Sequence, residues 1–324
     1  MGFLQKLLSC ERICIQCHND PDPDTIASAF GAYRYLQAHG VDAFIVYGGR
    51  NPIKKRGVEI MVSQCGIPIT YTHDPGEFDL LLLVDCQYGE GNVEPFPAQQ
   101  VAVIDHHIQV VEPGERVLIK NGYQSSSTIL WELLREEGYP LKEDQDLAVA
   151  LLYGLYIDTS CFADLYGQAD LAMRADLFEE QPLFETLTKS SMTLAELMVV
   201  SDALHNHFVD VERHFAVVEV LSCEQSLLGI IGDLMIQVDI VYLTFAYTEV
   251  GAGYRISLRT CHEQLPADRI AAYVCEGIGS GGGHGKKAGG YIQKSKLLEK
   301  FGNRPALEVI ETLLRRYIDE NVVF

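Results

Sequence analysis

Three short apolar segments of this chain each end at side chains that can bind a cation. Such runs predict buried strands, because central strands of a parallel sheet are apolar on both faces. The carboxyl ends of parallel strands meet at one edge, where open α/β sheets bind ligands. The segments and the residues that end them are Arg12–His18 with His18, Phe78–Val84 with Asp85, and Val101–Ile104 with Asp105, His106 and His107. The pattern predicts an α/β fold with a polar site at one edge of a mainly parallel sheet.

The loop after the first strand concentrates further ligands. His18, Asp22 and Asp24 lie within seven residues, and the prolines between them restrict the backbone and suppress helix. Thr25–His39 then has helical spacing. A helix needs only one acid as its N-cap, so capping does not account for the whole cluster.

A fourth acidic position follows a predicted helix, Gln145–Ile157. Asp158 stands at the carboxyl end of this helix, where the macrodipole disfavours a negative charge. An earlier helix, Ile129–Glu137, begins after the polar run Ser125–Thr128. Hydroxyl capping explains that run, although backbone N–H groups at a helix start also bind anions.

Together these positions offer four carboxylates and two imidazoles. Two like charges about 4 Å apart repel by about 4 kcal/mol at an effective dielectric near 20, so the acids require cations to stay ionised together. Aspartate and histidine ligands without thiolate favour Mn²⁺ over structural zinc, with Mg²⁺, Fe²⁺ and Co²⁺ as alternatives. Six ligands with one shared carboxylate suit two divalent ions. The predicted ligands are His18, Asp22, Asp24, Asp85, His106 and Asp158.

Length and composition predict the domain organisation and the compartment. A chain of 324 residues with 48% hydrophobic residues is expected to form two domains. We expect a catalytic domain at 1–190 with helices flanking its sheet, a linker at 191–212, and a smaller α/β domain at 213–324. Nine scattered cysteines suit a reducing compartment, and no run of eighteen apolar residues appears, so a cytoplasmic protein with no membrane partner is expected.

Two observations exclude other classes of site. The formal net charge of -20 argues against a protein that coats long duplex nucleic acid, because phosphate-tracking surfaces carry clustered Lys and Arg. Cys14 and Cys17 have zinc-type spacing, but a separation of three on one strand directs them to opposite faces. We therefore exclude a zinc site at this pair.

The glycine-rich segment Gly279–Gly290 is either a flexible surface loop or an anion-binding nest of backbone N–H groups. It matches neither the Walker A pattern nor the dinucleotide-binding glycine pattern. Three basic side chains within it, His284, Lys286 and Lys287, can hold phosphate oxygens, as can Arg259 at the end of a preceding predicted strand.

In this order the motifs resemble DHH-family phosphoesterases that carry a DHHA1 second domain, near the nano-RNases that also act as 3′-phosphoadenosine-5′-phosphate phosphatases. The matching positions are His18, Asp22, Asp24, Asp85, Asp105, His106, His107, Asp158 and Gly281-Gly282-Gly283-His284. The resemblance implies that one ion is bound by His18, Asp22 and Asp85. It implies that the other is bound by Asp24, Asp85, His106 and Asp158, with Asp85 bridging.

The resemblance also implies roles around the metals. Asp105 and His107 would be catalytic, with His107 beside the scissile phosphate as a stabiliser or proton donor. The DHHA1 domain would close over the substrate and hold its terminal phosphate or nucleotide. The implied substrate-binding residues are Arg259, Gly281, Gly282, Gly283 and His284.

The expected activity is two-metal hydrolysis of short oligoribonucleotides such as linear dinucleotides, or of phosphoadenosine phosphate. Two departures leave the substrate open: Pro23 stands where nano-RNases more often have glycine, and Gly285-Lys-Lys-Ala-Gly-Gly290 also occurs in exopolyphosphatase-like relatives. The alternatives are exopolyphosphatase or cyclic-dinucleotide phosphodiesterase activity, a metal-dependent nucleotide-binding regulator, and a purely structural protein. The partner is a short RNA or small nucleotide, and a homodimer is compatible with the sequence.

Overall fold

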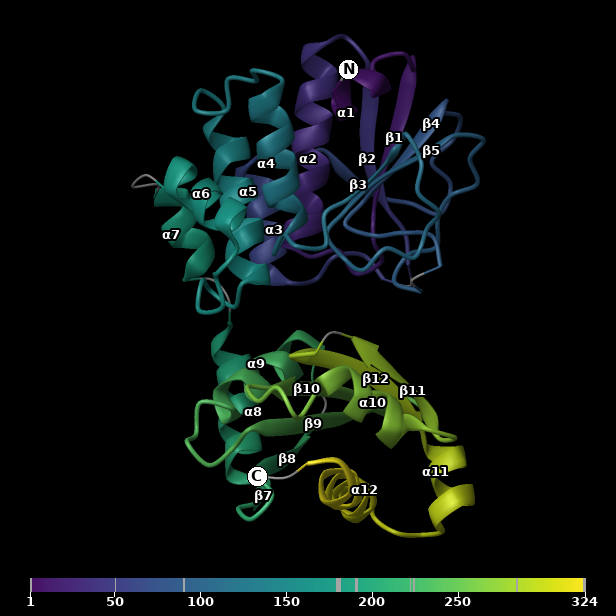
Figure 1. The fold of residues 1–324 in the computed structure, drawn as a ribbon, viewed down its shortest axis with the longest axis vertical. Coiled ribbons are helices and arrows are strands. Elements are labelled where there is room, and N and C mark those ends of the chain that lie inside the picture. The colour runs from purple at the N-terminus through teal and green to yellow at the C-terminus, as the bar shows by residue number, and fades with distance from the viewer. Residues whose placement is uncertain are drawn as a thin grey trace. The chain divides into compact units, whose positions relative to one another are not determined.

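Two six-stranded sheets organise the chain, one in each of two compact units, Met1–Ser191 and Met192–Phe324 (Figure 1). The computed structural model describes residues 2–49, 51–89, 91–178, 182–189, 192–221, 223, 225–283 and 285–322. Within these residues, no helix has both the length and the apolar character needed to cross a membrane.

The first unit contains a fully parallel sheet of order β3-β2-β1-β4-β5-β6. Its elements are α1 Phe3–Leu7, β1 Arg12–Cys17, α2 Pro23–Ala38, β2 Asp42–Tyr47, α3 Arg56–Gln64, β3 Ile69–Tyr71, β4 Leu80–Val84, β5 Val101–Asp105, β6 Val117–Ile119, α4 Ser126–Glu136, α5 Gln145–Asp158, α6 Gln168–Leu177 and α7 Pro182–Thr188. The predicted α/β class is confirmed, as is a mainly parallel sheet flanked by helices.

Burial explains this layering. Every residue of β4 is buried, as its continuous apolar run predicts for a central strand. Helices α2, α4 and α5 lie together on one side of the sheet (Figure 1), and their apolar residues share one core with Cys17. Cys14 belongs to a separate cluster on the other face, with Val93 and Phe96 from the loop between β4 and β5. The two cysteines therefore point to opposite faces.

The second unit has a mixed sheet of order β11-β12-β10-β9-β8-β7, in which β8 and β9 are parallel and the remaining pairs antiparallel. Its elements are α8 Leu194–His205, β7 His207–Asp210, β8 Phe215–Val220, α9 Gln225–Met235, β9 Leu243–Val250, β10 Gly253–Thr260, α10 Ala267–Cys275, β11 Gly279–Gly283, β12 Lys287–Gln293, α11 Lys294–Phe301 and α12 Ala306–Asn321. Alternation along β8 divides the core: Phe215 and Val217 pack with α10 and α12, whereas Ala216 and Val218 pack with α8 and α9.

The stretch 191–212, expected as a linker, contains α8 and β7, and Val200 and Ala203 of α8 are buried against the sheet. One stretch of the second unit differs from the expected local structure. The glycine-rich segment was expected to be a loop, and this was wrong for most of it: β11 and β12 form an antiparallel pair in which Gly281 faces Gly290. At Gly281 a Cβ atom would lie 2.6 Å from the Ala271 carbonyl oxygen of α10, so the missing side chain permits close packing.

Candidate metal centre

The ends of three neighbouring parallel strands lie level at one edge of the first sheet. Cys17 of β1 pairs with Val84 of β4, and Val84 pairs with Ile104 of β5. His18 and Asp85 directly follow β1 and β4, and β5 ends at Asp105. The register therefore brings the strand-end residues of the sequence pattern to a single edge.

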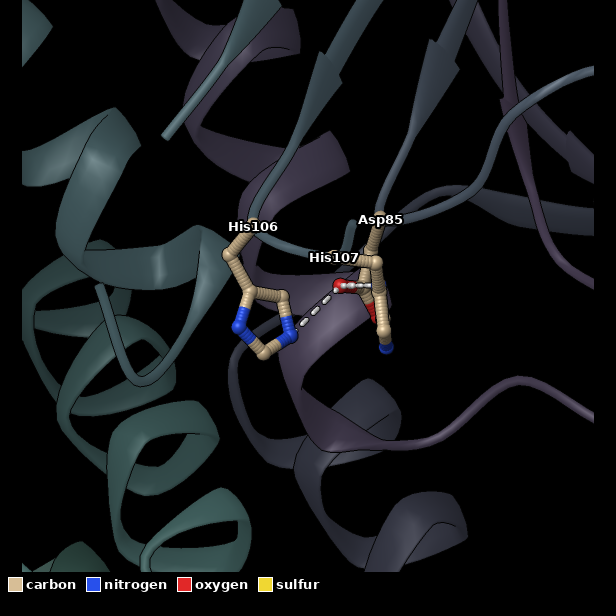
Figure 2. A group of neighbouring side chains, drawn as sticks. All are labelled: Asp85, His106 and His107. Atoms are coloured by element: carbon tan, nitrogen blue, oxygen red, sulfur yellow. Dashed lines mark ion pairs between the residues drawn. The ribbon is translucent and has the colours of Figure 1, made fainter. Parts of the chain in front are cut away.

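The six predicted metal ligands gather there, together with His107. Within each of three groups the candidate ligand atoms lie within 4.8 Å of one another. The groups are Asp85, His106 and His107; His18, Asp22 and Asp85; and Asp24, His106 and Asp158. Figure 2 shows the first group, with the His106 imidazole directed toward the Asp85 carboxylate.

Asp85 lies between the imidazoles of His18 and His106. Its Oδ2 atom is 3.6 Å from His18 Nε2, and its Oδ1 atom is 3.4 Å from His106 Nε2. The two oxygens of one carboxylate thus face different nitrogens, which is the arrangement required of a carboxylate that bridges two cations. His106 Nε2 is also 3.5 Å from Asp158 Oδ2, and His18 Nε2 is 3.7 Å from Asp22 Oδ1.

Backbone carbonyls orient both imidazoles. His18 Nδ1 lies 2.8 Å from the Asn19 carbonyl oxygen, and His106 Nδ1 lies 3.2 Å from that of Tyr123. Because a carbonyl only accepts hydrogen bonds, each Nδ1 carries the proton and each Nε2 faces the carboxylates. This second contact is typical of metal-binding histidines. His106 Nε2 is buried and has no hydrogen-bond partner among the described residues, as expected of an atom placed for a cation. The donor set therefore fits divalent ions.

Asp24, in α2, is fully buried and faces the amino end of α4. Its Oδ2 atom accepts from the Ser126 N–H at 2.7 Å, and its Oδ1 atom accepts from the Ser127 N–H at 2.8 Å. Burial, followed by the charges of Asp85 and Asp22, nevertheless raises the pKa of Asp24 well above its usual value. The carboxylate form is thus unfavourable in this pocket until a cation offsets the surrounding negative charge.

The same negative charges favour the charged form of His18, whereas they disfavour the charged form of Asp24. Burial acts to lower the pKa of its imidazole, but the hydrogen bond and charge of Asp22, together with those of Asp85, raise it well above its usual value. Burial also acts to raise the pKa of Asp22, and the contact with His18 reverses this and lowers it. The ring must lose its Nε2 proton to bind a metal, so metal binding at this site is coupled to proton release.

The backbone at Asp85 is held in a sparsely populated conformation. Its φ of 59° lies in the left-handed region, which disfavours residues other than glycine. The Asp85 N–H donates to the Ile104 carbonyl at 2.9 Å, and Ser126 Oγ donates to Asp85 Oδ1 at 2.9 Å. These contacts hold the Asp85 carboxylate in place. Left-handed backbone at a residue other than glycine costs about 1–3 kcal/mol, and such strain is concentrated at functional sites.

Asp105 and His107 form a pair beside this cluster. Asp105 is fully buried, and its Oδ1 atom accepts from His107 Nδ1 at 2.7 Å and from the His106 N–H at 2.8 Å. Burial acts to raise the pKa of Asp105, but the hydrogen bonds from His107 and Gln87 and the charges of the two neighbouring imidazoles together outweigh it and lower the pKa. Since Asp105 is enclosed, its contacts orient the His107 ring, and the partly exposed His107 is the member of the pair that can meet a substrate.

The predicted substrate-binding residues belong to the second unit. Arg259 Nε donates to Asp233 Oδ1 at 2.9 Å, and its NH1 group donates to Ser257 Oγ at 3.1 Å. Its side chain lies along two glycines of α9, since a Cβ at Gly232 would be 2.8 Å from Arg259 Cγ. In β11, a Cβ at Gly282 would meet no atom within 4 Å, whereas one at Gly283 would lie 2.5 Å from the Lys287 carbonyl oxygen. His284 lies outside the described residues.

Sequence reasoning identified the polar start of α4 but did not single out Gln87, a buried polar residue that shapes this site. Ser125 caps α4 through its Oγ, as expected, but the N–H groups that follow bind the protein's own Asp24. Gln87, fully buried in the loop after β4, donates to Asp105 Oδ2 at 2.5 Å. The available signal was its position, two residues after a strand-end ligand.

A parallel sheet with clustered aspartates and histidines at its carboxyl edge defines an α/β protein with a candidate dinuclear metal centre. Residues 12–155 match the model of the DHH family, N-terminal domain. This part of the chain therefore matches a DHH-family N-terminal domain, which confirms the DHH part of the resemblance drawn from the motifs. The matched stretch includes five of the six clustered ligands, and Asp158 follows it.

The chain is also similar to individual proteins. It is 24% identical over 314 residues to an uncharacterised protein of Methanocaldococcus jannaschii, covering 95% of this chain and 63% of that protein. It is 26% identical over 166 residues to the cyclic-di-AMP phosphodiesterase GdpP of Geobacillus thermodenitrificans, covering 47% of this chain and 25% of that protein. The chain thus spans less than two thirds of the length of these curated relatives.

One solved structure extends the likeness of fold to nearly the whole chain. An exopolyphosphatase-related protein from Bacteroides fragilis superimposes with a TM-score of 0.79 at 18% identity, covering 98% of this chain and 97% of that one. This similarity establishes the fold, including the second mixed sheet.

Proposed function

We propose that the chain is a metal-dependent phosphoesterase that hydrolyses short oligoribonucleotides, such as linear dinucleotides, or small nucleotides such as phosphoadenosine phosphate. The observation that carries the proposal is the position of Asp85, whose two oxygens face separate His–Asp groups beside an oriented His107. The match to the DHH family supports the same class of reaction.

The proposed cofactors are two divalent ions, with Mn²⁺ favoured by the mixed aspartate and histidine ligands. The ligands would be His18, Asp22, Asp24, Asp85, His106 and Asp158. Bound ions would supply Lewis-acid activation of water and of the phosphoryl group.

The chain's own residues would do the remaining work. His107 presents Nε2, because Nδ1 donates to Asp105. It would hold a proton near the leaving oxygen or stabilise charge on the phosphate. In the second unit, Arg259 and glycines 281–283 are the proposed phosphate-binding residues. Arg259 is supported by its fixed orientation against Asp233 and Ser257, which pre-organises a guanidinium suited to phosphate.

The test is Mn²⁺-dependent release of mononucleotide from a 5′-phosphorylated dinucleotide. Wild-type protein should be active, and Asp85→Ala should lose at least about 100-fold in rate, because even residues that only support metal ligands are worth 10- to 100-fold. The control is Asp42→Ala, which removes an exposed carboxylate at the start of β2 that pairs with Arg12, and it should retain full activity. An inactive wild type, or an Asp85→Ala variant with undiminished rate, would refute the proposal.

A second candidate is cleavage of a cyclic dinucleotide, favoured by the match to GdpP over 166 residues. A panel of linear dinucleotide, cyclic-di-AMP, phosphoadenosine phosphate and polyphosphate separates these activities. Tight nucleotide binding without turnover would instead indicate the metal-dependent regulator.

A further inference from the structure

Gln87 connects the loops that follow two neighbouring strands of the first sheet. It lies two residues after Asp85, beyond the end of β4, and the side-chain partners described for it lie in or after β5. Both Gln87 and Asp105 are fully buried. A fully buried glutamine is costly unless its amide is satisfied, so its contacts show what the residue holds.

Four hydrogen bonds define the orientation of this amide. Nε2 donates to Asp105 Oδ2 at 2.5 Å and to the Ile108 carbonyl at 3.1 Å. Oε1 accepts from the Val110 N–H at 2.8 Å and from the Val111 N–H at 3.3 Å. Exchanging the amide nitrogen and oxygen would set donors against donors and acceptors against acceptors. The donor is therefore directed at Asp105.

Through these contacts Gln87 acts on His107 from two sides. It donates to Asp105 Oδ2, the oxygen that does not contact His107. The other oxygen, Oδ1, then faces His107 Nδ1 at 2.7 Å. It also fixes the backbone that leaves His107, at Ile108 and Val110. Because Asp105 cannot rotate without losing the Gln87 donor, the tautomer and the plane of the His107 ring are both determined.

We propose that Gln87 is a positioning residue for His107, acting through Asp105 and the backbone after the Asp-His-His motif. Gln87 itself contacts no substrate. The inference rests on the proposed function for its kinetic consequences, whereas the orientation of the ring can be measured without any activity.

The kinetic test is a double-mutant cycle with a 5′-phosphorylated dinucleotide and Mn²⁺. Gln87→Met removes all four hydrogen bonds, and Gln87→Glu keeps the two acceptor contacts but opposes Asp105 with a second carboxylate. Both should lower kcat by about 100-fold, the effect of misplacing a catalytic group by about 1 Å, with KM unchanged. In a His107→Ala background the same substitutions should change kcat by less than about twofold, because residues that act as a unit are not additive.

Gln16 provides a matched control. It is also fully buried in the first sheet, and it ties a loop down by donating to the Glu94 carbonyl at 2.9 Å and accepting from the Phe96 N–H at 3.0 Å. Gln16→Met should lower the melting temperature by about as much as Gln87→Met does, but it should leave kcat unchanged. Gln87→Glu, which retains the contacts with the Val110 and Val111 N–H groups, serves as the test if Gln87→Met does not fold.

A second readout uses ¹⁵N-edited NMR of the histidine rings in metal-free protein. Wild type should show His107 as the Nδ1–H tautomer, and Gln87→Glu should shift the His107 ring resonances more than those of His18. Equal kcat losses with and without His107, or unmoved His107 resonances, would overturn the inference. An inactive wild type would refute the proposed function instead, and the NMR comparison would still decide the role of Gln87.

Discussion

The two units treat buried carboxylates in different ways. In the second unit, Asp210 accepts from Arg315 Nε at 2.9 Å and from the Arg213 N–H at 3.1 Å. In the first unit, Asp24 accepts from the Ser126 and Ser127 N–H groups and lies near two further acids. Burial acts to raise the pKa of both carboxyls. The hydrogen bonds and charges of Arg315 and Arg213 together outweigh it and lower the pKa of Asp210, whereas the charges of Asp85 and Asp22 add to it and raise the pKa of Asp24. Asp210 is thus held by cationic side chains, and the raised pKa of Asp24 fits the proposal that an external cation binds beside it.

The largest expected effect comes from neutralising Asp24. Asp24→Asn should lower the rate by at least about 100-fold, because it removes a charged ligand that is more directly involved than the supporting residues. Mn²⁺ at 100 times its Kd should stabilise wild type by about 2.7 kcal/mol, and the variant should lose most of this gain. Thermal unfolding with titrated Mn²⁺ measures it. Asp210→Asn is the control and should keep the full stabilisation by Mn²⁺. Full stabilisation of Asp24→Asn by Mn²⁺ would contradict the contrast between the two acids.

A smaller effect is expected from crowding the same carboxylate. Gly154 of α5 packs against α2, and a Cβ there would collide with Ser127 Oγ and lie 3.0 Å from both Cα and Oδ1 of Asp24. Gly154→Ala should therefore destabilise the fold by about 1–3 kcal/mol and weaken Mn²⁺ binding, since overpacked cores shift the backbone. Urea unfolding and Mn²⁺ titration measure the two effects. The control is Gly114→Ala, whose Cβ would make an ordinary 3.8 Å contact. Unchanged Mn²⁺ affinity in Gly154→Ala would show that Asp24 tolerates displacement.

The smallest effect on Mn²⁺ binding is expected at the paired acid, Asp210, where the change is one of stability. Asp210→Asn should cost about 1.5–3 kcal/mol at pH 7, the usual worth of hydrogen bonds to charged groups. Since the folded pKa of Asp210 is lowered, the stability from pairing is complete above the ordinary carboxyl pKa of about 3.9 and is lost as the pH falls below it. Urea unfolding should therefore show the difference between wild type and variant shrinking below about pH 4. A difference that grows in acid would contradict the assignment.

The sequence was most informative where apolar runs end in polar residues. The strands ending at His18, Asp85 and Asp105 could be predicted because a parallel sheet aligns its carboxyl ends, and this alone brought distant residues together. The glycine-rich segment was predicted less well. Its glycine-rich composition shows only that side chains are absent. The structure shows that this backbone forms a strand and that α10 packs against it in the space that side chains would occupy. Gln87 was missed because its position two residues after Asp85 does not show that its side chain will be buried.

The left-handed backbone at Asp85 has a consequence for how the fold and the site compete. Glycine adopts such dihedral angles without steric cost, so the chain carries at this position a residue that local geometry disfavours. Trade-offs of this kind between stability and activity are common when a site is built on a strained turn. Asp85→Gly would relieve this strain through a single codon change, and it would remove the carboxylate that is proposed to serve both ions.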